Sequence, residues 1–97
     1  MTRTPATLEK TLQREIIAEC KRREWLVFYS RMDSRTTRPA GEPDLQILMG
    51  DGRFLLIECK TAKGKLSDAQ LAVQANARKL GHTIYVVRSF EDFLSLV

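Results

Sequence analysis

Three charged side chains, Asp44, Glu58 and Lys60, border two apolar runs in the middle of the chain. Asp44 opens the first run, and Glu58 and Lys60 end the second. Successive side chains on a β-strand alternate between faces, so Glu58 and Lys60 emerge on the same face, about 7 Å apart. Two carboxylates and an ammonium gathered at a strand end are typical of a divalent-metal site that hydrolyses phosphodiester bonds.

This chemistry depends on the pairing of the two strands that the apolar runs predict, 44–49 and 53–60. A two-residue turn between them would leave Asp44 facing away from Glu58. A three-residue loop at 50–52, with a glycine in the left-handed conformation, places Asp44 opposite Glu58. Because glycines stand at both ends of this loop, the sequence favours the three-residue form and a shared site.

A helix is predicted upstream of these strands, from Pro5 to about Arg23, with Thr4 as its N-cap. Apolar side chains recur in it every four residues and form one stripe, at Leu8, Leu12, Ile16 and Cys20. At about 100° per residue, Glu9 lies near the middle of that stripe. A carboxylate on the inward face needs a partner, because burying it unpaired is costly.

The remaining segments complete an α-β-β-β-α-β-α order. A strand, a helix, a second strand and a short helix are predicted at 25–30, 68–80, 83–88 and 90–97. The helix at 68–80 begins with a capping box of Ser67 and Gln70, and Gly81 ends it. The segment 31–42 has no apolar period, and we interpret it as a long loop.

Length and composition indicate one domain, 1–97, without room for a separate recognition domain. No apolar run approaches the roughly 20 residues needed to span a bilayer, and the N-terminus lacks the apolar core of a signal peptide. Cys20 and Cys59 have no metal-ligand spacing and fit reduced, buried thiols. We therefore expect a cytoplasmic protein with no membrane association.

The charge balance favours a polyanionic partner. The chain has 16 basic and 12 acidic residues, a net charge of +4 and an isoelectric point near 9.4. Cations flank the acidic cluster on both sides in sequence, at Arg31, Arg35, Arg38, Lys63 and Lys65. We interpret these five residues as candidate contacts to the phosphates of DNA.

Together these segments resemble the VRR-NUC domain, a family of the PD-(D/E)XK nuclease superfamily. The resemblance covers about 8–97, and its matching segments are 9–13 (EKTLQ), 41–45 (GEPDL), 57–60 (IECK) and 65–70 (KLSDAQ). It implies an α/β restriction-endonuclease-like core, in which helices flank a four-stranded mixed sheet. Each residue also has a purely structural explanation when it is considered alone. Asp44 can simply start a strand, and Glu58 and Lys60 can form an ion pair at a strand end. Their joint occurrence in this order favours the nuclease interpretation.

The resemblance implies a Mg²⁺- or Mn²⁺-dependent endodeoxyribonuclease. Asp44 and Glu58 would bind the metal with the backbone carbonyl of Cys59, a ligand set that suits a hard cation which keeps several waters. Lys60 would orient or deprotonate the attacking water, or stabilise charge in the transition state. Glu9 would bind the metal directly or through water, or hold Lys60. Gln70 would orient Lys60 or the water, and it also has a complete structural explanation in the capping box.

Without a recognition domain, backbone contacts and DNA shape should determine the substrate, which indicates structured or branched DNA. Stand-alone VRR-NUC domains look like homodimeric Holliday-junction resolvases, so the resemblance implies a homodimer in a bacterial or phage-infected host cell. Two alternatives remain. One is a DNA-binding module on a nuclease fold that does not cleave, and the other is a small basic α/β interaction protein.

Overall fold

The computed structural model describes residues 5–29 and 40–97, with side chains described from residue 8 onward in the first range. Its elements follow the predicted α-β-β-β-α-β-α order. The helices and strands are α1 (Pro5–Arg22), β1 (Leu26–Tyr29), β2 (Leu45–Leu48), β3 (Phe54–Cys59), α2 (Asp68–Lys79), β4 (Ile84–Val87) and α3 (Phe90–Leu94). The predicted N-cap Thr4 and the arginines 31, 35 and 38 lie outside the described residues.

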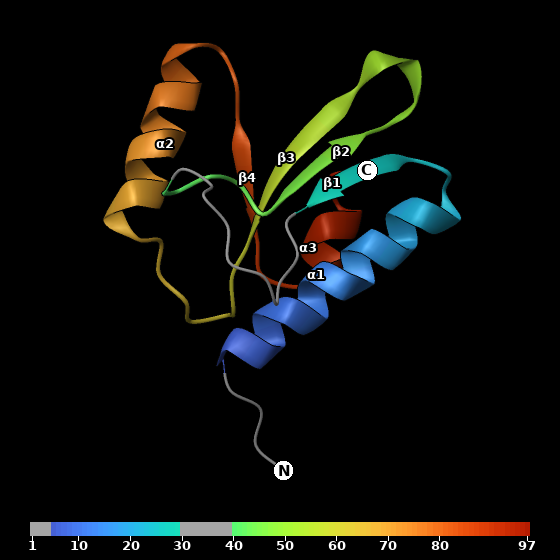
Figure 1. Ribbon diagram of the computed structural model, residues 1–97, viewed down its shortest axis with the longest axis horizontal. Coiled ribbons are helices and arrows are strands. Elements are labelled where there is room, and N and C mark those ends of the chain that lie inside the picture. The colour runs from blue at the N-terminus through green and yellow to red at the C-terminus, as the bar shows by residue number, and fades with distance from the viewer. Residues whose placement is uncertain (1–4, 30–39) are drawn as a thin grey trace.

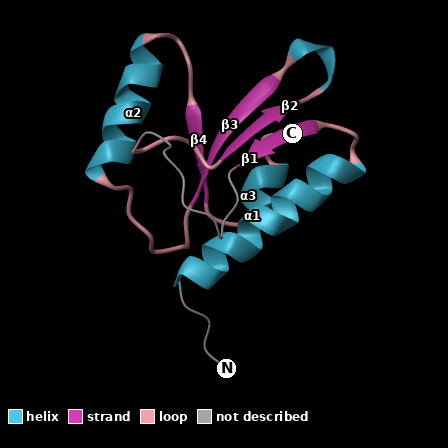
Figure 2. Ribbon diagram, in the orientation of Figure 1, coloured by secondary structure: helices cyan, strands magenta, loops and turns pink. Residues whose placement is uncertain are grey.

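The four strands form one mixed sheet in the order β1-β2-β3-β4. The first three strands pair antiparallel, and β4 joins β3 in parallel after the crossover through α2 (Figures 1 and 2). Because β3 and β4 are parallel, both end at the same edge of the sheet, beside the loop that leads into α2 (Figure 2). The predicted fold class, an α/β mixed sheet flanked by helices, is confirmed.

The hydrophobic core lies between α1, α3 and one face of the sheet. The strands alternate: Leu45 and Ile47 of β2 are buried, whereas Gln46 and Leu48 between them are exposed. The buried apolar residues are Leu12, Ile16, Ile17, Cys20, Leu45, Ile47, Ile57, Cys59, Val87 and Phe93. None of them belongs to α2, which instead faces the opposite side of the sheet across Leu56 and Ile84. The sheet thus carries its main core on one face only.

The β2–β3 hairpin has the predicted register. Leu45 pairs with Ile57 and Leu48 with Phe54, so Asp44 lies opposite Glu58 one step further along. The three-residue turn Gly50–Gly52 closes the hairpin, and Met49 N–H donates to the Arg53 carbonyl at 2.9 Å. Both Asp51 and Gly52 take positive φ angles, 60° and 75°, so an aspartate shares the left-handed conformation predicted for a glycine.

The ends of the helices follow the sequence signals, with one difference. Ser67 and Gln70 form the predicted capping box at the start of α2, and Gly81 follows that helix with φ 86°. The last helix begins after its cap Ser89 but ends at Leu94, not at Val97 as predicted. Within the described residues, no helix is both long enough and apolar enough to cross a membrane.

Candidate active site

Asp44 and Glu58 lie side by side at the end of the hairpin opposite its turn. Asp44 accepts a hydrogen bond on Oδ2 from the backbone N–H of Cys59, at 2.8 Å, which ties the start of β2 to the end of β3. Glu58 is only 3% exposed, and it is the one buried charged residue in the described part of the chain. The register therefore brings both predicted carboxylates to one place on the sheet.

The surroundings of Glu58 disfavour its charged form. Burial is the largest cause, the negative charge of Asp44 comes next, and a hydrogen bond between the two carboxyl groups adds to both; together they raise the pKa of Glu58 to about 8. The charge of Lys60 opposes this rise, and Glu9 adds to it. A cation with hard oxygen ligands would offset these causes, because its positive charge favours the charged form of Glu58.

Gln70 joins the capping box to the acidic pair. Its side-chain oxygen accepts from Ser67 N–H at 2.8 Å, and its Nε2 donates to Glu58 Oε1 at 2.6 Å. Its own backbone N–H donates to the Ser67 hydroxyl at 3.1 Å. The two explanations of Gln70 from sequence are therefore compatible, because one amide side chain serves the helix cap and contacts the site. The contact seen is to Glu58, not to Lys60.

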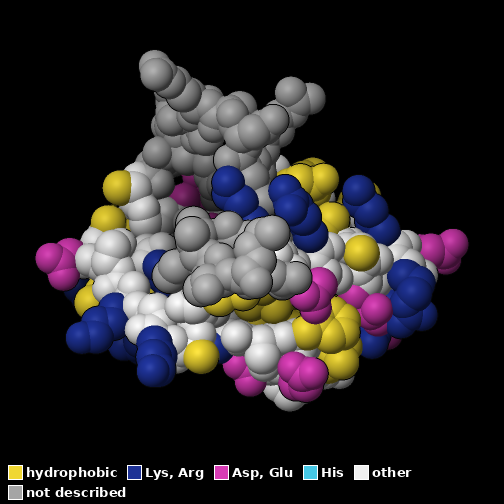
Figure 3. Space-filling model, turned by 90° about the horizontal axis from the view of Figure 1, so that it is seen from below, with side chains coloured by type: hydrophobic (Ala, Val, Ile, Leu, Met, Phe, Trp, Pro, Cys, Tyr) yellow, Lys and Arg dark blue, Asp and Glu magenta, His cyan; other side chains and the backbone are white. Residues whose placement is uncertain are grey.

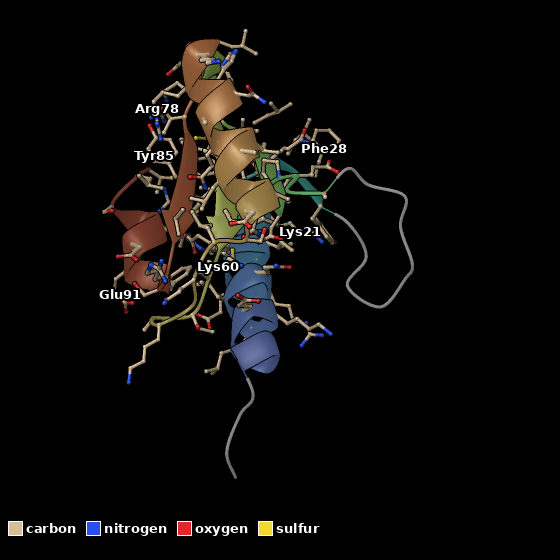
Figure 4. The ribbon with its side chains drawn as sticks, turned by 90° about the vertical axis from the view of Figure 1, so that its left-hand side faces the viewer. Lys21, Phe28, Lys60, Arg78, Tyr85 and Glu91 are labelled. Carbon is tan, nitrogen blue, oxygen red and sulfur yellow. The ribbon has the colours of Figure 1, made fainter. Side chains whose placement is uncertain are left out.

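Lys60 and Glu9 meet beside this pair. Lys60 Nζ lies 4.0 Å from Glu9 Oε1, and the two side chains are 15% and 31% exposed. The arrangement matches one of the three options for Glu9, that of holding Lys60. Glu9 lies near the middle of the buried face of α1, as predicted, because Leu12, Ile16 and Cys20 follow it at helical spacing and are buried. Leu8, in contrast, is 41% exposed and lies off that face. Figure 4 labels Lys60, which lies where β3 passes into the loop that leads to α2.

The five basic residues predicted to contact DNA divide into two groups. Lys63 and Lys65 are exposed on the loop 60–67, directly after Lys60. Figure 3 shows this side of the molecule from below, where Lys and Arg side chains are spread over the described surface with acidic side chains among them. Arg31, Arg35 and Arg38 lie outside the described residues, so their predicted DNA contacts remain predictions.

Sequence reasoning missed Arg88, which follows β4 and contacts the loop 60–67 through its guanidinium group. Nothing near Arg88 in the sequence indicates this contact, which arises from the parallel pairing of β3 and β4. A cavity of about 450 Å³ opens beside Lys60 and Arg88, and its lining includes Leu8, Leu12, Lys60, Thr61, Arg88 and Phe90.

The donor set at the site fits a hard cation bound by few protein ligands. Within the described residues, no group of three His, Cys, Asp or Glu side chains lies close enough to hold a metal ion. A bound ion would rest on Asp44, Glu58 and a backbone carbonyl such as that of Cys59, with waters completing its shell. Mg²⁺ tolerates this arrangement, because it keeps several waters and needs only one or two carboxylates.

Comparison with known proteins identifies the family. The model of the VRR-NUC domain family matches residues 2–91. A solved structure described as a VRR-NUC domain has a TM-score of 0.73 and 26% identity, with 92% of each chain covered. A second, described as a VRR-NUC domain protein, has a TM-score of 0.70 and 22% identity over 91% of this chain and 83% of the other. No curated protein gives a significant match. The chain therefore belongs to the VRR-NUC domain family, a family of nuclease domains.

Proposed function

We propose that this protein is a Mg²⁺- or Mn²⁺-dependent endonuclease that hydrolyses phosphodiester bonds in branched DNA. The observation that supports this most strongly is the pairing of Asp44 with the buried Glu58, next to Lys60. Membership of a nuclease family agrees with DNA hydrolysis, and the donor set agrees with a hard divalent cation. The cation, the branched substrate and the oligomeric state are parts of the proposal.

The side chains of the site divide the work. Asp44 and Glu58 bind the cation, which when present would polarise the scissile phosphate and lower the pKa of a bound water. Gln70 holds one oxygen of Glu58 and so fixes the direction in which that carboxylate points. Lys60 orients the attacking water and stabilises the negative charge that develops on the phosphate. Glu9 keeps the Lys60 ammonium group beside the acidic pair.

DNA would reach the site across the loop 60–67. Lys63 and Lys65 would contact phosphates there, and Arg31, Arg35 and Arg38 would do so from the segment that precedes Asp44. Contacts of this type position a duplex without reading its bases, which favours recognition by DNA shape. A Holliday junction or another branched structure is the substrate that we propose.

A homodimer would place two such sites on opposing strands of a junction. An exposed apolar patch supports this part of the proposal. Leu26 pairs with Leu48 and Leu48 with Phe54, so the three side chains share the sheet face away from the core. They are 60%, 43% and 49% exposed, respectively. Contiguous apolar side chains of this kind often mark a protein–protein contact, and a second copy of the chain is the partner that we propose.

The test is cleavage of matched four-way junction, flap and linear duplex DNA in Mg²⁺, Mn²⁺ or EDTA. We expect a cut in the junction or flap with either cation and no product in EDTA. Lys60→Ala should abolish the cut, whereas Lys79→Ala at the far end of α2 should not. Binding without any cleavage would favour the alternative of a non-cleaving DNA-binding module. Cleavage that persists in EDTA would contradict the proposed chemistry.

A further inference from the structure

The backbone of Arg88 is held in place where β4 ends. One residue earlier, the Val87 carbonyl accepts from Lys60 N–H at 3.0 Å, which extends the parallel pairing of β3 and β4 to Lys60. The Arg88 N–H itself donates to Asp92 Oδ2 at 3.0 Å. Asp92 belongs to the first turn of α3, and its own N–H donates to Ser89 Oγ. Arg88 therefore leaves the sheet from a fixed point directly beside the start of the loop 60–67.

The guanidinium group of Arg88 gathers the carbonyl groups of that loop. Its Nη1 donates to the carbonyl oxygens of Gly64 at 2.6 Å and Thr61 at 2.7 Å, and lies 3.5 Å from that of Ala62. The loop is folded as a turn at this point, since Gly64 N–H also donates to the Thr61 carbonyl at 3.1 Å. The Arg88 guanidinium thus forms hydrogen bonds to the first and the last residue of the turn 61–64.

The turn is tight as well as cross-linked. A Cβ atom added at Gly64 would lie 2.9 Å from Thr61 Oγ1 and 3.6 Å from Lys60 Cδ. The packing at Gly64 therefore reaches the side chain of Lys60. Lys63 lies inside this turn and Lys65 directly after it. The conformation of the turn therefore determines the positions of Lys63 and Lys65 relative to Lys60.

We propose that Arg88 is a positioning residue for DNA: it holds the turn 61–64 so that Lys63 and Lys65 meet the phosphate backbone beside Lys60. The DNA part rests on the proposed nuclease function, whereas the hold on the turn does not. Arginine suits this task because its planar guanidinium directs several N–H groups in fixed directions, which a lysine ammonium does not. Hydrogen bonds from a charged donor are also stronger than those between neutral groups.

A direct contact between Arg88 and a phosphate is the competing explanation, and the two differ in their response to lysine. Arg88→Lys keeps the positive charge, so it would preserve most of a direct phosphate contact. It loses the geometry that joins the Thr61 and Gly64 carbonyls, so it would not preserve a positioned turn. Arg78→Met is a matched control, since Arg78 is an exposed arginine at the end of α2 remote from Lys60 (Figure 4).

The experiment combines two measurements on Arg88→Lys, Arg88→Met and Arg78→Met in the full chain. The first is hydrogen exchange of the amides of 61–66, whose opening we expect to be about tenfold more frequent in both Arg88 variants and unchanged in Arg78→Met. The second is the dissociation constant for four-way junction DNA as a function of salt. Both Arg88 variants should bind about tenfold more weakly. The slope of the logarithm of the binding constant against the logarithm of the salt concentration should become less steep, by an amount that corresponds to up to about two lost phosphate contacts.

Two results would overturn the inference. Wild-type exchange at 61–66 in Arg88→Lys would show that the guanidinium does not hold the turn. Loss of DNA affinity in Arg88→Met that Arg88→Lys restores would indicate a direct phosphate contact. If the wild-type protein binds no DNA, the proposed function fails, and the exchange measurement still tests the hold on the turn by itself. Unchanged circular dichroism in Arg88→Lys verifies that the comparison is made on a folded chain.

Discussion

Replacing Glu58 by glutamine should remove activity and at the same time stabilise the cation-free protein. Glu58 is buried against Asp44, and Gln70 Nε2 donates to its Oε1. A glutamine at this position keeps an oxygen for Gln70 and gains an amide that can donate to Asp44. The substitution therefore removes the electrostatic repulsion from Asp44 and keeps a hydrogen bond between the two side chains, with almost no change in volume.

The size of the effect follows from the pKa of Glu58, which rises from an ordinary value of 4.5 to about 8. Between these two values the folded protein binds more protons than the unfolded chain, so the free energy of unfolding falls as the pH rises through this window. Each pKa unit is worth about 1.4 kcal/mol, so a rise of this size gives a loss of at most roughly 4 kcal/mol at pH 8, which solvent screening reduces. Glu58→Gln has no such loss, so it should match the wild type near pH 4.5 and exceed it at pH 8.

The assay is urea unfolding of both proteins in EDTA between pH 4.5 and pH 8, repeated with Mg²⁺ or Mn²⁺. The cation should stabilise the wild type at pH 8 and leave Glu58→Gln unchanged, because only the wild type has both carboxylates to bind it. Equal pH dependence of the two proteins in EDTA would refute the electrostatic reasoning. A Glu58→Gln protein that is less stable than the wild type at pH 8 would refute it as well.

Three further predictions concern other parts of the molecule. Gln70→Ala should lower cleavage more than Ser67→Ala, because only Gln70 contacts Glu58. Each variant should lose about 1 kcal/mol of stability in urea unfolding, since each breaks the helix cap. Equal cleavage by the two variants would count against the contact with Glu58. Burial raises the pKa of the Cys20 thiol to about 11 and that of Cys59 further. Iodoacetamide at pH 8 should therefore label both thiols only after unfolding, and rapid labelling of the native protein would contradict this. Sedimentation should show a species of twice 11.1 kDa that Phe54→Glu dissociates; an 11.1 kDa wild-type species would reject the dimer.

Features set by neighbouring residues were predictable from the sequence. The glycines at both ends of the turn 50–52 indicate a three-residue loop. A loop of this length sets the strand register in which Asp44 lies opposite Glu58. The capping box of Ser67 and Gln70 is likewise complete within four residues. In both cases the determining interaction lies inside the segment, so the packing of the rest of the chain does not alter it.

Features set by tertiary packing were not predictable in the same way. The contact of Gln70 with Glu58 depends on where α2 lies over the sheet, and that of Arg88 with Gly64 depends on which strand β4 joins. The position of Glu9 depends on the rotation of α1 about its axis, which the whole core determines. A stripe of apolar residues fixes that rotation only to within its own width. The stripe therefore did not predict that Leu8 would be exposed while Glu9 faces inward.

The most direct test of the central claim is the cleavage rate of four-way junction DNA in Mg²⁺ by Asp44→Asn, compared with Asp51→Asn. Both substitutions remove one negative charge from the same hairpin, at its site end and at its exposed turn, respectively. Asp51→Asn should cleave like the wild type, because asparagine tolerates the left-handed conformation at that position. Asp44→Asn should lower the cleavage rate by a factor of about 10³ or more. Wild-type cleavage by Asp44→Asn would contradict the assignment of this carboxylate pair as the active site.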